Sequence, residues 1–81
     1  MNTRTIAQQW ANFEKAVLPA NAGPVQRQEM RRAFYGGFGA ALMASVEIAD
    51  AELTDEAGAA VLEGYHQECA LFVQAVQEGR A

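Results

Sequence analysis

The sequence predicts an all-α fold, with a short N-terminal helix and a long antiparallel helical hairpin that self-associates into a helical bundle. Apolar residues recur at spacings of three and four in three segments, and nowhere alternate with a period of two. Proline, glycine and asparagine separate the first two segments. The 81 residues suffice for one domain, residues 1–81. A chain this short buries only about 60–65% of its surface, so we expect self-association to add stability.

The first helix is predicted over about residues 5–18. Thr5 can cap it, and Gln8 three residues later completes a capping box. Its apolar residues form one continuous stripe: Ile6, Trp10, Phe13 and Val17. The segment Pro19–Pro24 then ends the helix, because proline lacks a backbone donor and glycine and asparagine favour turns.

The second helix is predicted over about residues 24–49, with Pro24 at its first position, where a missing N–H costs nothing. Its apolar side carries Met30, Phe34, Phe38, Leu42 and Val46. Gly36, Gly37 and Gly39 lie in its interior, where each glycine costs about 1 kcal/mol. Two explanations are open: another helix approaches closely, which we favour, or the helix is broken or kinked there.

Small residues on this helix define the expected subunit interface. Five of them form a strip that lets helix backbones approach: Gly36, Gly37, Ala40, Ala41 and Ala44. We therefore expect a homo-oligomer, dimer or higher, built on this strip. Packing of the strip within one subunit is the alternative.

The third helix is predicted over about residues 55–78. Thr54 is a good N-cap, Asp55 and Glu56 complement the helix dipole, and Gly79 ends the helix. We expect its buried face to consist of Val61, Leu62, Tyr65, Cys69, Phe72, Val73 and Val76.

Catalytic and metal chemistry are not indicated. Glu63 and His66 share one helix face, but the nearest useful acid on the facing helix, Glu29, would lie roughly 18 Å away. This distance excludes a di-metal site within one subunit, so that only a dimer could complete one. Cys69 lies on the apolar stripe, and we expect it to be a buried small hydrophobe. No nucleophile triad, phosphate loop or dinucleotide motif is present. We expect a non-enzymatic protein with neither metal nor cofactor.

Basic residues gather near the start of the second helix, where the helix dipole disfavours them. One interpretation is local ion pairing with Glu14 and Glu29. The other is an anion site in which arginines bind phosphate and an aromatic ring stacks on a base. The candidate ligand-binding residues are Arg27, Arg31, Arg32, Tyr35, Lys15 and Trp10.

The overall charge limits the partners. A net charge of −4 argues against general nucleic-acid binding. The longest uncharged stretch, residues 33–46, is too short to span a bilayer, and the N-terminal residues do not resemble a secretory signal. We therefore expect a cytoplasmic protein without membrane association.

Three segments of the sequence carry a resemblance: Trp10-x-x-Phe13, Val17-Leu-Pro19 and Val25-Gln-Arg-Gln-Glu-Met-Arg-Arg-Ala-Phe-Tyr-Gly-Gly37. Together they resemble a family of small uncharacterised proteins of tailed bacteriophages and prophages. The resemblance covers about residues 10–76, and Gln26–Gly37 is its most specific part. It implies an early or accessory phage gene product that acts in the host cytoplasm, and it assigns no residue roles.

These observations lead to one expected function and one alternative. By analogy with small helical phage proteins of this size and class, we expect a phage accessory protein that acts in counter-defence, either by sequestering a phosphorylated ligand such as a cyclic nucleotide or by blocking a host protein. The alternative is a structural or virion-assembly helical protein without a ligand.

Overall fold

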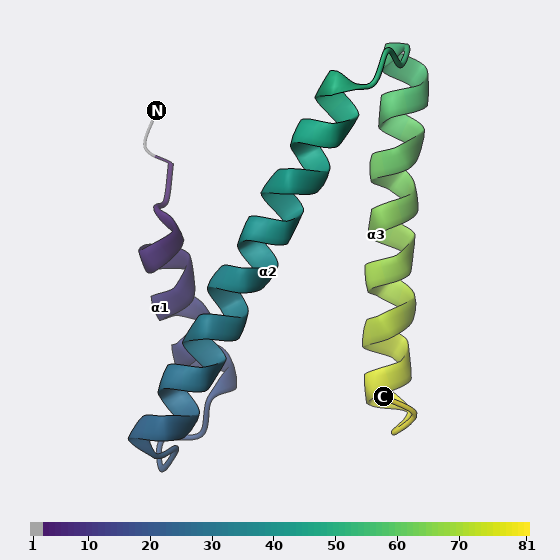
Figure 1. The fold of residues 1–81 in the computed structure, drawn as a ribbon. Helices are drawn as coiled ribbons and strands as arrows, with labels where there is room; N and C mark the ends of the chain where they lie inside the picture. The colour runs from purple at the N-terminus through teal and green to yellow at the C-terminus, as the bar shows by residue number, and fades with distance from the viewer. Residues whose placement is uncertain (1–2) are drawn as a thin grey trace. The chain divides into compact units, whose positions relative to one another are not determined.

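The computed structural model describes residues 3–81 and confirms the all-α prediction. It contains helices α1 (Ile6–Val17), α2 (Pro24–Asp50) and α3 (Asp55–Gln77), and no strand within the described range (Figure 1). The observed bounds of each helix differ from the predicted ones by no more than one residue at either end.

The helix ends use the predicted local hydrogen bonds. Thr5 Oγ1 accepts a bond from the Gln8 backbone N–H (3.1 Å), and Gln8 Oε1 accepts one from the Thr5 N–H (2.8 Å), which completes the capping box. At the start of α3, Thr54 Oγ1 accepts a bond from the Ala57 N–H (3.1 Å). After α3, Gly79 adopts φ +75°, a left-handed conformation that glycine tolerates best.

The chain forms two compact units, Met1–Ala44 and Ser45–Ala81, which we call the N-terminal unit and the C-terminal unit. The N-terminal unit holds α1 and most of α2. The C-terminal unit holds the last turns of α2 and all of α3.

The N-terminal unit is held together by aromatic side chains of α1 and α2. The ring centroids lie 5.5 Å apart for Trp10 and Phe34, 5.1 Å for Phe13 and Phe34, and 5.9 Å for Trp10 and Phe13. Trp10 and Leu18 are buried, at 7% and 8% exposure. Tilted rings at these distances pack favourably beyond the area they bury. Of the apolar stripe predicted on the first helix, Trp10 is therefore core and Ile6 and Phe13 are partly buried, whereas Val17 is 54% exposed.

The C-terminal unit contains no buried residue. Its helices meet near the turn, where a Cβ at Gly58 would lie 3.7 Å from Ile48 Cγ2. The predicted buried face of α3 is wrong for most of its length: only Val61 is partly buried, whereas Cys69 is exposed and Phe72 is 62% exposed. The physical reason is that the last turns of α2 are too short to cover more than the start of α3 within this unit.

The glycines of α2 have no close neighbour in the described chain. The helix runs without a break from Pro24 to Asp50. A Cβ built at Gly36, Gly37 or Gly39 would meet no atom of the described residues within 4 Å. The structure thus shows an unbroken helix and, within the N-terminal unit, no close approach at these positions.

We expect Gly36→Ala to raise the free energy of unfolding by about 0.5–1 kcal/mol, because alanine costs less backbone entropy inside a helix and the site has room for a Cβ. Urea titration followed by circular dichroism would measure the change. Gly79→Ala is the opposite control and should destabilise, because its φ of +75° strains any L side chain. A loss of stability in Gly36→Ala would mean that another helix meets Gly36 at close range.

Candidate functional site

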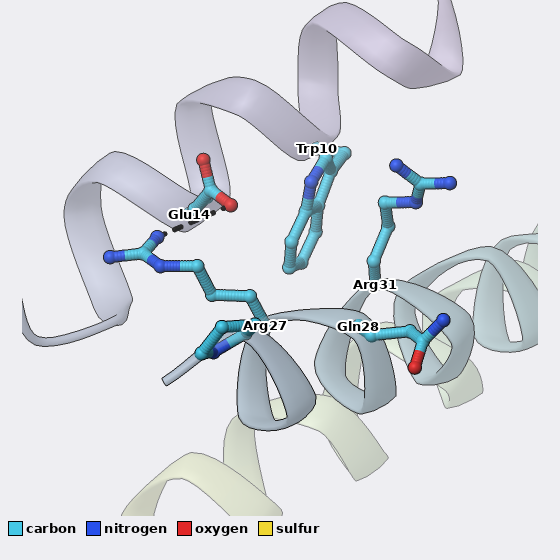
Figure 2. Close-up of a pocket in the computed structure, with 6 residues that line it drawn as sticks. Trp10, Glu14, Arg27, Gln28 and Arg31 are labelled. Carbon is cyan, nitrogen blue, oxygen red and sulfur yellow. Dashed lines mark ion pairs between the residues drawn. The ribbon is translucent and has the colours of Figure 1, made fainter. Parts of the chain in front are cut away.

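A pocket of about 330 Å³ lies between α1 and α2 in the N-terminal unit. Its lining comprises Trp10, Glu14, Pro24, Arg27, Gln28 and Arg31. Figure 2 shows the Trp10 ring between the Arg27–Glu14 pair on one side and the Arg31 side chain on the other. The pocket therefore combines one aromatic face with two guanidinium groups and one carboxylate.

Arg27 is engaged by the turn that joins α1 to α2. Its Nε donates to the Ala22 carbonyl (3.2 Å), and its Nη2 lies 3.4 Å from the carbonyl oxygens of Pro19 and Ala20. Its Nη1 also lies 3.3 Å from Glu14 Oε2, with both side chains about one-third exposed. Arg27 thus holds the turn against α1, and few of its donors are left for a ligand.

Arg32 is also paired locally. Its Nη1 lies 3.4 Å from Glu29 Oε1, one helical turn away, and both side chains are largely exposed. Arg32 does not line the pocket. The ion-pairing interpretation therefore describes both Arg27 and Arg32.

Arg31 differs from these two arginines. It lines the pocket, it is exposed, and within residues 3–81 it has neither an ion pair nor a side-chain hydrogen bond. The Arg27–Glu14 pair is neutral overall, so Arg31 leaves the pocket with one uncompensated positive charge. A guanidinium offers five donors in a planar fork that matches carboxylate and phosphate oxygens.

The structure brings together three of the six candidate ligand-binding residues: Trp10, Arg27 and Arg31. Lys15 and Arg32 are not among the lining residues. The rings of Tyr35 and Phe34 pack in a T-shaped arrangement (6.4 Å between centroids), and Tyr35 also does not line the pocket.

Gln28 and Pro24 line the pocket and were not singled out from the sequence. Gln28 lies three residues before Arg31, a spacing that places both side chains on one helix face. This spacing was the signal that could have identified Gln28.

A second, apolar groove of about 480 Å³ also lies in the N-terminal unit. It is lined by Gln9, Ala33, Phe34, Gly37, Phe38 and Ala41. Two residues of the predicted interface strip, Gly37 and Ala41, belong to it, whereas Gly36, Ala40 and Ala44 do not.

The described residues show no cluster of three or more histidine, cysteine or acidic side chains that could hold a metal ion. Among the helices of residues 3–81, none combines the length and the apolar character needed to cross a membrane. Comparisons with protein-family models, curated proteins and solved structures gave no significant match. The function is therefore inferred from the fold, from the pocket that contains Trp10 and Arg31, and from the apolar groove beside Gly37.

Proposed function

We propose that the protein is a small non-enzymatic phage accessory protein that acts in counter-defence by binding a phosphorylated, nucleotide-type ligand in the cytoplasm of the host. The observation that supports this most directly is Arg31, an arginine without an acidic partner among the described residues, in the same pocket as Trp10. The phage context rests on the resemblance of residues 10–76.

The pocket has complementary parts for such a ligand. Arg31 would bind a phosphate oxygen pair, and the Gln28 amide would add a donor beside it. Trp10, which lines the pocket although only 7% of it is exposed, would contact a base. The Glu14 carboxylate disfavours a dense negative charge, so the ligand would carry a single phosphodiester rather than a triphosphate.

The proposed active form is a homo-oligomeric helical bundle in which α2 and α3 form an antiparallel hairpin. The support is the lack of any buried residue in the C-terminal unit, which leaves that unit without a core of its own. Gly37, which lines the apolar groove and where a built Cβ would meet nothing within 4 Å among the described residues, is suited to contact between subunits.

Two other functions have specific support. The local pairing of Arg27 and Arg32 fits a structural or virion-assembly protein without a ligand. The many exposed apolar side chains of α3 fit a protein that blocks a host protein by contact. Binding of a nucleotide-type ligand by the wild type would favour the ligand-binding proposal over both the structural function and the blocking of a host protein.

We expect Arg31→Ala to weaken ligand binding by about ten- to a hundredfold, because a hydrogen bond to a charged group contributes about 1.5–3 kcal/mol. The melting temperature should stay nearly constant or rise slightly, because Arg31 is exposed, has no ion pair within residues 3–81, and alanine is the best helix former. Titration calorimetry with cyclic mononucleotides, cyclic dinucleotides and inorganic phosphate would measure the binding.

The matched control is Arg32→Ala, which removes an equal charge one residue away but outside the pocket. It should leave ligand affinity unchanged within about twofold, since Arg32 does not line the pocket and its charge is paired with Glu29. Absence of binding of all three probe classes by the wild type would overturn the ligand proposal and favour the structural alternative.

A further inference from the structure

α3 carries an apolar stripe that its own unit leaves uncovered. Five exposed residues follow one another at spacings of three, four, three and four: Leu62, Tyr65, Cys69, Phe72 and Val76. This alternation averages 3.5 residues and is the pattern of a helix that packs lengthwise against a partner. Most of the stability of such a helix comes from covering its apolar face, so the stripe requires a partner.

The apolar groove of the N-terminal unit offers a complementary surface. The aromatic rings of Phe34 and Phe38 line the groove. Gly37 and Ala41 also line it, and because their side chains are small they leave the α2 backbone accessible there. A Cβ at Gly37 would meet nothing within 4 Å among the described residues. A foreign side chain can therefore approach the α2 backbone closely there.

The charges of the two units favour contact between unlike surfaces. Residues 1–44 carry five basic and two acidic side chains, a net charge of +3. Residues 45–81 carry one basic and eight acidic side chains, a net charge of −7. Two C-terminal units therefore repel each other, whereas a C-terminal unit and the N-terminal unit of another molecule attract.

We infer that the α3 stripe of one molecule docks in the apolar groove beside Gly37 of a second copy of this chain, and that the second copy returns the same contact. Such a reciprocal exchange closes a two-fold dimer and covers both surfaces at once. This inference rests on the proposed self-association and adds which surfaces meet. Phe72 is the central anchor because it is the largest wholly apolar side chain of the stripe and, at 62% exposure, is more exposed than Leu62, Tyr65 or Val76.

The test measures association by sedimentation and native mass spectrometry at tens of micromolar protein. Phe72→Glu and Gly37→Leu should each raise the dimer dissociation constant by about tenfold or more, one by placing a charge in the apolar contact and the other by filling the groove. Circular dichroism of each variant would verify that its helices are retained.

Each variant has a matched control. Leu71→Glu introduces the same charge at a neighbouring side chain that is 66% exposed but lies off the stripe, and it should leave the dimer intact. Gly36→Leu adds the same volume at the adjacent glycine, which does not line the groove, and should also leave the dimer intact.

Mixing the two defective variants provides the decisive measurement. Phe72→Glu keeps its groove and Gly37→Leu keeps its stripe, so a mixture can form one of the two contacts and should yield a heterodimer that neither variant forms with itself. Raising the salt concentration should weaken the wild-type dimer, because salt screens attraction between unlike charges.

A wild-type protein that stays monomeric, with Phe72 covered within its own chain or free for a foreign protein, would overturn both this inference and the proposed self-association. A wild-type dimer that strengthens with salt, and that Gly37→Leu does not affect, would overturn this inference alone, because α3 would then pack on α3. Ligand titration of the Phe72→Glu variant tests the Arg31 pocket independently of either result.

Discussion

Trp10→Ala is expected to remove most of the stability of the N-terminal unit, with a loss of about 3–5 kcal/mol in the free energy of unfolding. Trp10 is one of two buried hydrophobic residues in the described chain and contacts two aromatic rings, those of Phe13 and Phe34. A domain of this size has a total stability of about 4–12 kcal/mol, so the remaining structure would be marginal. Urea titration followed by far-ultraviolet circular dichroism would measure the loss.

Two controls define what this result means. Trp10→Phe keeps an aromatic ring against Phe34 and should lose less than half as much stability. Val25→Ala truncates a side chain that is 71% exposed and should change stability by no more than about 0.5 kcal/mol. Equal losses in Trp10→Ala and Val25→Ala would contradict the placement of the core between α1 and α2.

Arg27→Gln is expected to destabilise the protein by about 1–2 kcal/mol, because the guanidinium connects three carbonyl groups of the turn to Glu14. The contacts are 3.2–3.4 Å long and the side chain is one-third exposed, which places the expected loss toward the lower end of the range for charged hydrogen bonds. Chemical denaturation of the wild type and the variant would give the difference.

Single substitutions distinguish the contribution of the Arg27–Glu14 ion pair to stability from that of the carbonyl contacts of Arg27. Glu14→Gln removes only the ion pair and should lose less stability than Arg27→Gln, and high salt should abolish its effect. Arg32→Gln removes an exposed pair on one helix and should lose about 0.5 kcal/mol or less. If Glu14→Gln were as destabilising as Arg27→Gln, the carbonyl contacts would contribute nothing.

Arg27 and Arg31 both line the pocket, but within residues 3–81 only Arg27 is bound by other groups of the chain. The guanidinium of Arg27 donates to backbone carbonyls of the turn, so replacing Arg27 is expected to change the free energy of unfolding. Arg31 has no acidic partner among the described residues, so its replacement tests recognition. A site prediction based on charge alone treats the two as equivalent, because both lie on the same stripe of the second helix at a spacing of four.

Local features of the fold were predictable from the sequence. The capping box of Thr5 and Gln8, the N-cap Thr54 and the stop at Gly79 all depend on residues within a few positions of one another. The same is true of Pro24 at the start of α2. Such interactions form wherever the residues occur, so the helix bounds could be predicted to within about one residue.

The apolar stripe of α3 shows what the sequence leaves open. Spacing identifies which residues share a helix face, but not whether anything covers that face. From the pattern alone, Cys69 and Phe72 are as suited to a core as Trp10 is, yet only Trp10 is buried.

By itself, the sequence determined three helices, their ends and their apolar faces, because these follow from contacts between near neighbours along the chain. The tertiary structure decided which of those faces is covered, and that Arg27 has an acidic partner whereas Arg31 has none among residues 3–81. Both depend on the turn that folds α1 against α2, where the Trp10 ring reaches Phe34 and the Arg27 guanidinium reaches Pro19, Ala20 and Ala22. Contacts between residues far apart in the chain depend on three-dimensional packing, and a periodic pattern does not specify that packing.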